Sequence, residues 1–87
     1  MNSTDIKQKI EAHIEGSLAL VTGDDGAHFD AIVVSDIFTG KTLVKRQQLV
    51  YAALTDWISS GQLHALALRT LTLEQWDAEQ RKSEWTN

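Results

Sequence analysis

The chain has 87 residues, a formal net charge of −4 and no cysteine. This length allows one domain with a thin core, and a hydrophobic content of 43% is typical of a globular rather than a disordered protein. The absence of cysteine excludes a disulfide, a thiolate metal site and a thiolate nucleophile within the chain.

The charge balance and the apolar runs restrict the partners further. Twelve acidic residues against eight basic ones argue against non-specific nucleic-acid binding, although a local basic patch remains compatible with this balance. No apolar run approaches the roughly 20 residues that cross a bilayer, and Met-Asn-Ser-Thr-Asp is too polar for a signal peptide. We therefore expect a cytoplasmic protein without membrane contact. It should form a single domain over 1–87, with a core at about 4–82 and a polar tail at 83–87.

In the first third of the chain, the sequence predicts a helix followed by a β-hairpin. Isoleucines four residues apart mark an apolar helix stripe within residues 4–15. Two β-rich runs follow, at 17–22 and 28–35, separated by the turn residues of Gly23-Asp-Asp-Gly26. The second run is apolar on both faces, which is typical of a strand in the middle of a sheet.

The remainder predicts a long helix, a third strand and a last helix. The long helix spans about 42–59, and five residues form its apolar face: Leu43, Val50, Leu54, Trp57 and Ile58. The third strand covers about 62–70. Thr72 and Gln75 then form a capping box, which opens a last helix of roughly ten residues anchored by Leu73 and Trp76.

The element order is αββαβα, which indicates the α+β class. A helical crossover of about 25 residues lets the third strand return parallel to the second. The expected architecture is a three-stranded mixed sheet with helices packed on it. If these two strands are neighbours, their first residues share one edge of the sheet, and His28 begins one strand while His64 begins the other.

Each of these two histidines also has an ordinary structural interpretation. On its spacing alone, His64 is better explained as a packed or hydrogen-bonded residue, and His28 as a solvated turn residue. As a pair on one edge they form an incomplete metal site. A neutral imidazole ligates borderline metals and can replace thiolate on one iron of a 2Fe–2S cluster. In a chain without cysteine, a partner would have to supply the remaining ligands of such a cluster.

Other patterns give weaker signals. The segment 35–42 is placed like a P-loop, but Ser35 stands where the loop needs glycine, so we exclude a nucleotide site. Lys41, Lys45 and Arg46 form a small basic cluster, which is either a solvated helix end or a contact with nucleic acid or an acidic partner. No catalytic triad or carboxylate pair stands at a useful spacing, so an enzyme is not expected.

Two segments resemble a known family. Val33-Val-Ser-Asp-Ile-Phe-Thr-Gly-Lys-Thr-Leu-Val-Lys-Arg-Gln-Gln-Leu-Val-Tyr51 and Leu63-His-Ala-Leu-Ala-Leu-Arg-Thr-Leu-Thr-Leu-Glu-Gln-Trp76 are similar to the BolA family. Within the family, Val44-Lys-Arg-Gln-Gln-Leu-Val-Tyr51 and the turn Gly26-Ala-His-Phe29 are most similar to the IbaG (YrbA) branch. The resemblance covers roughly residues 6–80 and implies a class II KH-like fold. The chain has Gln47 where many members carry histidine, and the glycine-flanked loop of RNA-binding KH domains is missing at 38–41.

The resemblance also implies a partner and a shared cofactor. Proteins of this family associate with monothiol glutaredoxins, in which a cysteine and glutathione supply thiolates to a 2Fe–2S cluster. His64 matches the family's histidine ligand, and His28 stands in the loop region that supplies the second ligand. We expect no cofactor in the isolated chain.

The expected function is therefore a non-enzymatic adaptor in iron–sulfur trafficking, or in an iron or stress response. The alternative is a DNA-binding transcriptional regulator that uses Lys41, Lys45 and Arg46. Without a partner we expect a monomer or a weak homodimer.

Overall fold

The structure is a computed structural model that describes residues 1–23 and 28–85, and for 83–85 the backbone alone. Most of the predicted turn, residues 24–26, lies outside the described residues. The elements along the chain are α1 (Ser3–His13), β1 (Leu18–Thr22), β2 (His28–Val34), the 3-10 turn η1 (Asp36–Phe38), α2 (Leu43–Ala53), α3 (Thr55–Ser59), β3 (Ala65–Leu71) and α4 (Leu73–Trp85). Within the described ranges, no helix has the length and apolar character of a membrane span.

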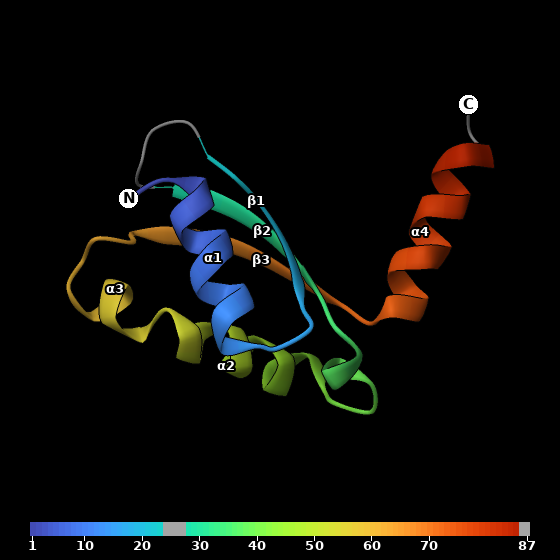
Figure 1. Ribbon diagram of the computed structural model, residues 1–87, viewed down its shortest axis with the longest axis horizontal. Coiled ribbons are helices and arrows are strands. Elements are labelled where there is room, and N and C mark those ends of the chain that lie inside the picture. Colours follow the sequence, from blue (N-terminus) through green and yellow to red (C-terminus); the bar gives the residue numbers. More distant parts are fainter. Residues whose placement is uncertain (24–27, 86–87) are drawn as a thin grey trace.

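The three strands form one mixed sheet in the order β1-β2-β3. β1 is antiparallel to β2, and β3 runs parallel to β2, with His28 opposite Ala65. Figure 1 shows the crossover between β2 and β3, which runs through η1, α2 and α3. The predicted αββαβα order and the mixed sheet are confirmed, with α2 and α3 together in the place of the one predicted crossover helix.

The core lies between one face of the sheet and the helices α1 and α2. Ile6 and Ile10 of α1 and Val50 of α2 are fully buried. They belong to one cluster with Phe29 and Val33, which stand at alternate positions of β2 and therefore share a face. The isoleucine stripe seen in the sequence is thus the surface with which α1 covers the sheet.

The predicted continuous helix over 42–59 is wrong, because the helix breaks at Leu54. The hydroxyl of Thr55 donates to the carbonyl oxygen of Tyr51 at 3.2 Å, so a side chain takes an acceptor of the helical ladder. Leu54 itself is fully buried. A periodic face cannot continue across such a break. Accordingly Ile58, which follows the break, is exposed although it was predicted on the buried face. Leu43 was predicted on the same face and is also exposed (65%), but it is the first residue of α2 and the break does not account for its position.

The last helix does not cover the sheet as predicted. Figure 1 shows α4 extending away from the body beyond the end of β3. The capping box is confirmed, since Thr72 N–H donates to Gln75 Oε1 (2.9 Å) and Gln75 N–H donates to Thr72 Oγ1 (3.1 Å). Trp76 is half-buried, but Leu73 is 46% exposed and is not the anchor that we expected. A capping box fixes where a helix begins and not the surface on which it lies.

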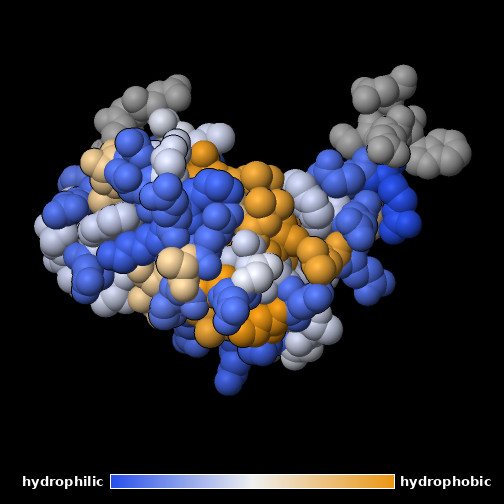
Figure 2. All heavy atoms as spheres, viewed as in Figure 1, coloured by the Kyte–Doolittle hydropathy of each residue, from blue (hydrophilic) through white to orange (hydrophobic). Residues whose placement is uncertain are grey.

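The sheet face opposite the core cluster has an apolar surface in contact with solvent. Leu18 and Leu20 of β1 are 39% and 38% exposed. They lie opposite Val34 and Ile32 of β2, on the face that does not carry Phe29 and Val33. We call this surface the open face. Figure 2 shows hydrophobic residues gathered between the helical body and α4.

The outer edge of β1 is held by two side chains of α1. Ala19 N–H donates to Glu11 Oε2 (2.9 Å), and Lys7 Nζ donates to the Ala19 carbonyl oxygen (2.9 Å). Lys7 and Glu11 also form an ion pair at 2.8 Å. The bond from Ala19 and the neighbouring Lys7 lower the pKa of Glu11 below its ordinary value of 4.5.

Replacing Glu11 by glutamine should lower the free energy of unfolding at neutral pH by about 1 kcal/mol, since it removes a charge-assisted contact at a partly exposed site. A carboxyl whose pKa is lower in the folded state contributes stability above its unfolded pKa and loses it as the pH falls through the folded pKa. The deficit of E11Q should therefore shrink as the pH falls below 4.5. Urea unfolding at pH 7 and at pH 3 measures it, with Glu15→Gln, at an exposed position just beyond the end of α1, as the control. A deficit of equal size at both pH values would contradict this account.

Candidate functional site

His64 lies in the link that leads from α3 into β3. Gly61 has a φ of +80° and turns the chain after α3. Leu63 is then buried, and its N–H donates to the carbonyl oxygen of Trp57 at 3.0 Å. The Trp57 ring is held against α1, with Lys9 Nζ 4.2 Å from its centroid. The link is therefore fastened to the helical layer at the residue before His64.

The strand that follows is shorter at its start than predicted. β3 begins at Ala65 and not at residue 62, so exposed His64 is the residue that precedes the strand. His64 also borders a hollow of about 200 Å³. Its other lining residues come from α2, α3, the link and the start of β3: Tyr51, Ile58, Leu63, Ala65 and Leu66.

His28 is the first residue of β2 and is exposed. Its neighbour Phe29 is buried in the core cluster. Because successive side chains of a strand point to opposite faces, this alternation assigns His28 to the open face.

The parallel pairing brings the two histidines to the same end of the sheet, as predicted from the topology. His28 is opposite Ala65, and His64 is one residue earlier in β3's chain direction. They approach that end from different sides, since His64 borders a hollow walled by helical residues and His28 belongs to the open face. An ion bound by both imidazoles must therefore lie beyond the strand ends and not over either face.

The described residues hold no complete metal site by themselves. Among them, no three His, Cys, Asp or Glu side chains gather closely enough to hold a metal ion. As ligands, His28 and His64 would thus fill two positions of a coordination shell and leave the others to a second molecule.

The basic cluster predicted as a nucleic-acid contact is divided by the fold. Arg46 is only 8% exposed. Its Nε donates to the carbonyl oxygen of Lys41 (3.0 Å), and its Nη1 donates to Gln75 Oε1 (3.1 Å). Arg46 thus ties the start of α2 to the start of α4. Lys45 is exposed, whereas Lys41 is half-buried and its Nζ donates to the Ile37 carbonyl oxygen.

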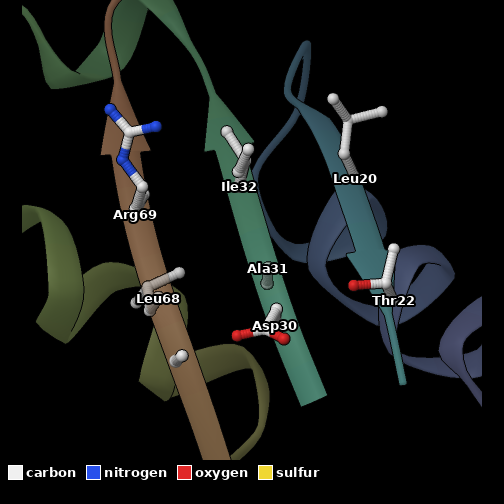
Figure 3. Close-up of a pocket in the computed structure, with 8 residues that line it drawn as sticks. Leu20, Thr22, Asp30, Ala31, Ile32, Leu68 and Arg69 are labelled. Atoms are coloured by element: carbon white, nitrogen blue, oxygen red, sulfur yellow. The ribbon is translucent and has the colours of Figure 1, made fainter. Parts of the chain in front are cut away.

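A second hollow lies on the open face, where the sequence predicted no site. It has a volume of about 320 Å³. Figure 3 shows Arg69 of β3 toward one end of the hollow, with Ile32 and Leu20 on the neighbouring strands. Asp30 of β2 and Thr22 of β1 lie toward the other end. Arg69 is also paired with Glu79 of α4 at 3.1 Å. The sequence signal for this hollow was the presence of Asp30 in β2 and Arg69 in β3, two charged residues in otherwise largely apolar strands.

Comparisons with known proteins agree with this architecture. A family model described as BolA-like protein matches residues 3–75. A protein from the rpoN-murA intergenic region of Acinetobacter guillouiae is 40% identical over 76 residues, which are 87% of this chain and 90% of that protein. The acid stress protein IbaG of Escherichia coli is 36% identical over 72 residues, covering 83% of this chain and 75% of IbaG.

A solved structure extends the likeness to three dimensions. The structure of a BolA protein homologue from Coxiella burnetii superposes with a TM-score of 0.79 at 38% identity. The match covers 88% of this chain and 97% of the homologue. With a family model over most of its length and relatives above 35% identity, this chain belongs to the BolA family.

Proposed function

We propose that this chain is a non-enzymatic adaptor that pairs with a monothiol glutaredoxin to bind or transfer a shared 2Fe–2S cluster. The observation that supports it is the placement of His28 and His64 at one end of the parallel pair β2–β3, in a chain without cysteine. Both histidines are exposed. His28 is the first residue of β2, and His64 directly precedes the first residue of β3. A second protein can therefore reach them without unfolding any element.

The donor set fits half of such a cluster. A 2Fe–2S cluster accepts imidazole in place of thiolate on one of its irons. In this assignment His64 and His28 are the two nitrogen ligands. The glutaredoxin cysteine and glutathione supply the thiolates, so the isolated chain holds no cluster. When bound, the cluster supplies one-electron and iron–sulfur transfer chemistry.

The surroundings of His64 suit the role of a fixed ligand. The buried Leu63 and its bond to Trp57 hold the backbone immediately before the imidazole. A ligand whose backbone is already ordered loses little conformational freedom when it binds. The relation to an E. coli protein described as an acid stress protein also supports a place for this chain in a stress response.

The first test is the visible absorption and circular dichroism of the shared complex. Mixing the chain with a monothiol glutaredoxin, glutathione, iron and sulfide should give a coloured complex whose spectrum differs from that of the glutaredoxin homodimer, because nitrogen replaces sulfur around iron. His64→Ala should remove this difference. His13→Ala changes an exposed histidine of α1 and should have no effect. An unchanged spectrum in H64A would rule out His64 as a ligand.

The second test counts the nitrogen ligands. Pulsed electron paramagnetic resonance of the reduced complex should detect ¹⁴N couplings from two imidazoles in the wild-type chain and from one in His28→Ala. Loss of a nitrogen ligand should also lower the reduction potential of the cluster. If H28A keeps both couplings, the second ligand is not His28, whereas the assignment of His64 is unaffected.

A DNA-binding role is the second candidate, and the exposed Lys45 beside Lys41 in the segment that opens α2 is the observation that favours it. Arg46 is engaged within the fold, so two cations remain. If they contact phosphates, replacing both by glutamine should weaken binding and reduce the slope of log K against log[salt] by about 2. Mobility shifts of duplex DNA at several salt concentrations measure this slope. The absence of any shift at low salt would discard the candidate.

A further inference from the structure

β1 is an edge strand, so one side of its backbone has no neighbouring strand. Such an edge is a template for pairing with another chain. The bonds of Ala19 to α1 show that its N–H and C=O point outward, away from β2. Since backbone groups alternate along a strand, those of Val21 point the same way.

Lys7 and Glu11 occupy the place of a missing strand at Ala19. Glu11 accepts the outward N–H and Lys7 donates to the outward carbonyl oxygen, both at 2.9 Å. The two side chains also pair with each other at 2.8 Å. A neighbouring strand offers the same two functions, one acceptor and one donor, so this pair uses both backbone groups through which Ala19 would join a further strand.

The strand behind this pair is suited to pairing with itself. Residues 17–22, Ser-Leu-Ala-Leu-Val-Thr, carry no charge and no proline, a composition that favours association between strands. Every copy of the chain carries the same edge, and an antiparallel pair of two β1 strands has two-fold symmetry. Such pairing places the exposed Leu18 and Leu20 of one copy beside those of the other, so that two open faces become continuous.

We propose that the Lys7–Glu11 pair blocks the edge of β1. Loss of its bonds to the Ala19 backbone lets the chain dimerise through antiparallel pairing of β1 with β1 of a second copy. The other possible effect of losing these bonds is local fraying of β1 without association. Neither histidine belongs to this pair, so the proposal stands independently of the cluster-binding function.

Sedimentation velocity of Glu11→Ala and Lys7→Met against the wild-type chain tests the proposal. Each variant should shift the monomer–dimer equilibrium at least tenfold toward the dimer at equal concentration. Glu15→Ala, at an exposed position beyond the end of the same helix, should leave the equilibrium unchanged. If E11A fails to fold, as judged by circular dichroism, K7M carries the test, because it frees the carbonyl oxygen of Ala19 and removes the cation that pairs with Glu11.

A double variant identifies the surface. Leu20→Lys places a charge on an exposed position of β1, and like charges facing each other across paired strands oppose association. The variant E11A/L20K should therefore return to the wild-type equilibrium. The proposal is overturned if a folded E11A or K7M sediments like the wild type, or if the dimer persists in E11A/L20K.

Discussion

The parallel pairing of β2 with β3 is the constraint on which the rest of the structure depends. Parallel neighbours need a crossover, and here η1, α2 and α3 provide it while they cover one face of the sheet. The same pairing sets two strand starts side by side, so that His28 and His64, which are 36 positions apart in sequence, lie at the same end of the sheet. The scaffold and the candidate site thus have one cause, and neither could be rearranged without the other.

Those features that rest on local chemistry or on chain topology could be predicted from the sequence. The capping box of Thr72 and Gln75 and the parallel return of the third strand belong to this group, because each follows from a few adjacent residues or from the length of a connection. The common end of the two histidines was predictable for the same reason. The different sides from which they approach that end were not predicted, because these follow from the register, which sets His28 opposite Ala65 and not opposite His64.

The features that were missed depend on contacts between distant segments. The helix break at Leu54 combines a threonine hydroxyl with the full burial of a leucine, which helical periodicity alone does not reveal. Arg46 looked like a surface cation beside two lysines, yet its guanidinium finds acceptors in Lys41 and Gln75, the second of them 29 residues away. A buried guanidinium is tolerated only where such acceptors exist, and a sequence does not show that they converge. The direction of α4 was missed because its anchoring lies in this same network.

Gln75 serves two elements at once, since its amide oxygen accepts from the backbone of Thr72 and from Arg46. The match to the family model ends at this residue. Beyond it, α4 projects from the body (Figure 1), and of its side chains Trp76 and Glu79 are the half-buried ones among those described. The contacts of Gln75 thus determine where α4 begins, whereas most of the helix's described side chains are in contact with solvent. Substitutions at these exposed positions should change the surface of the protein with little effect on the stability of the sheet and the helices that cover it.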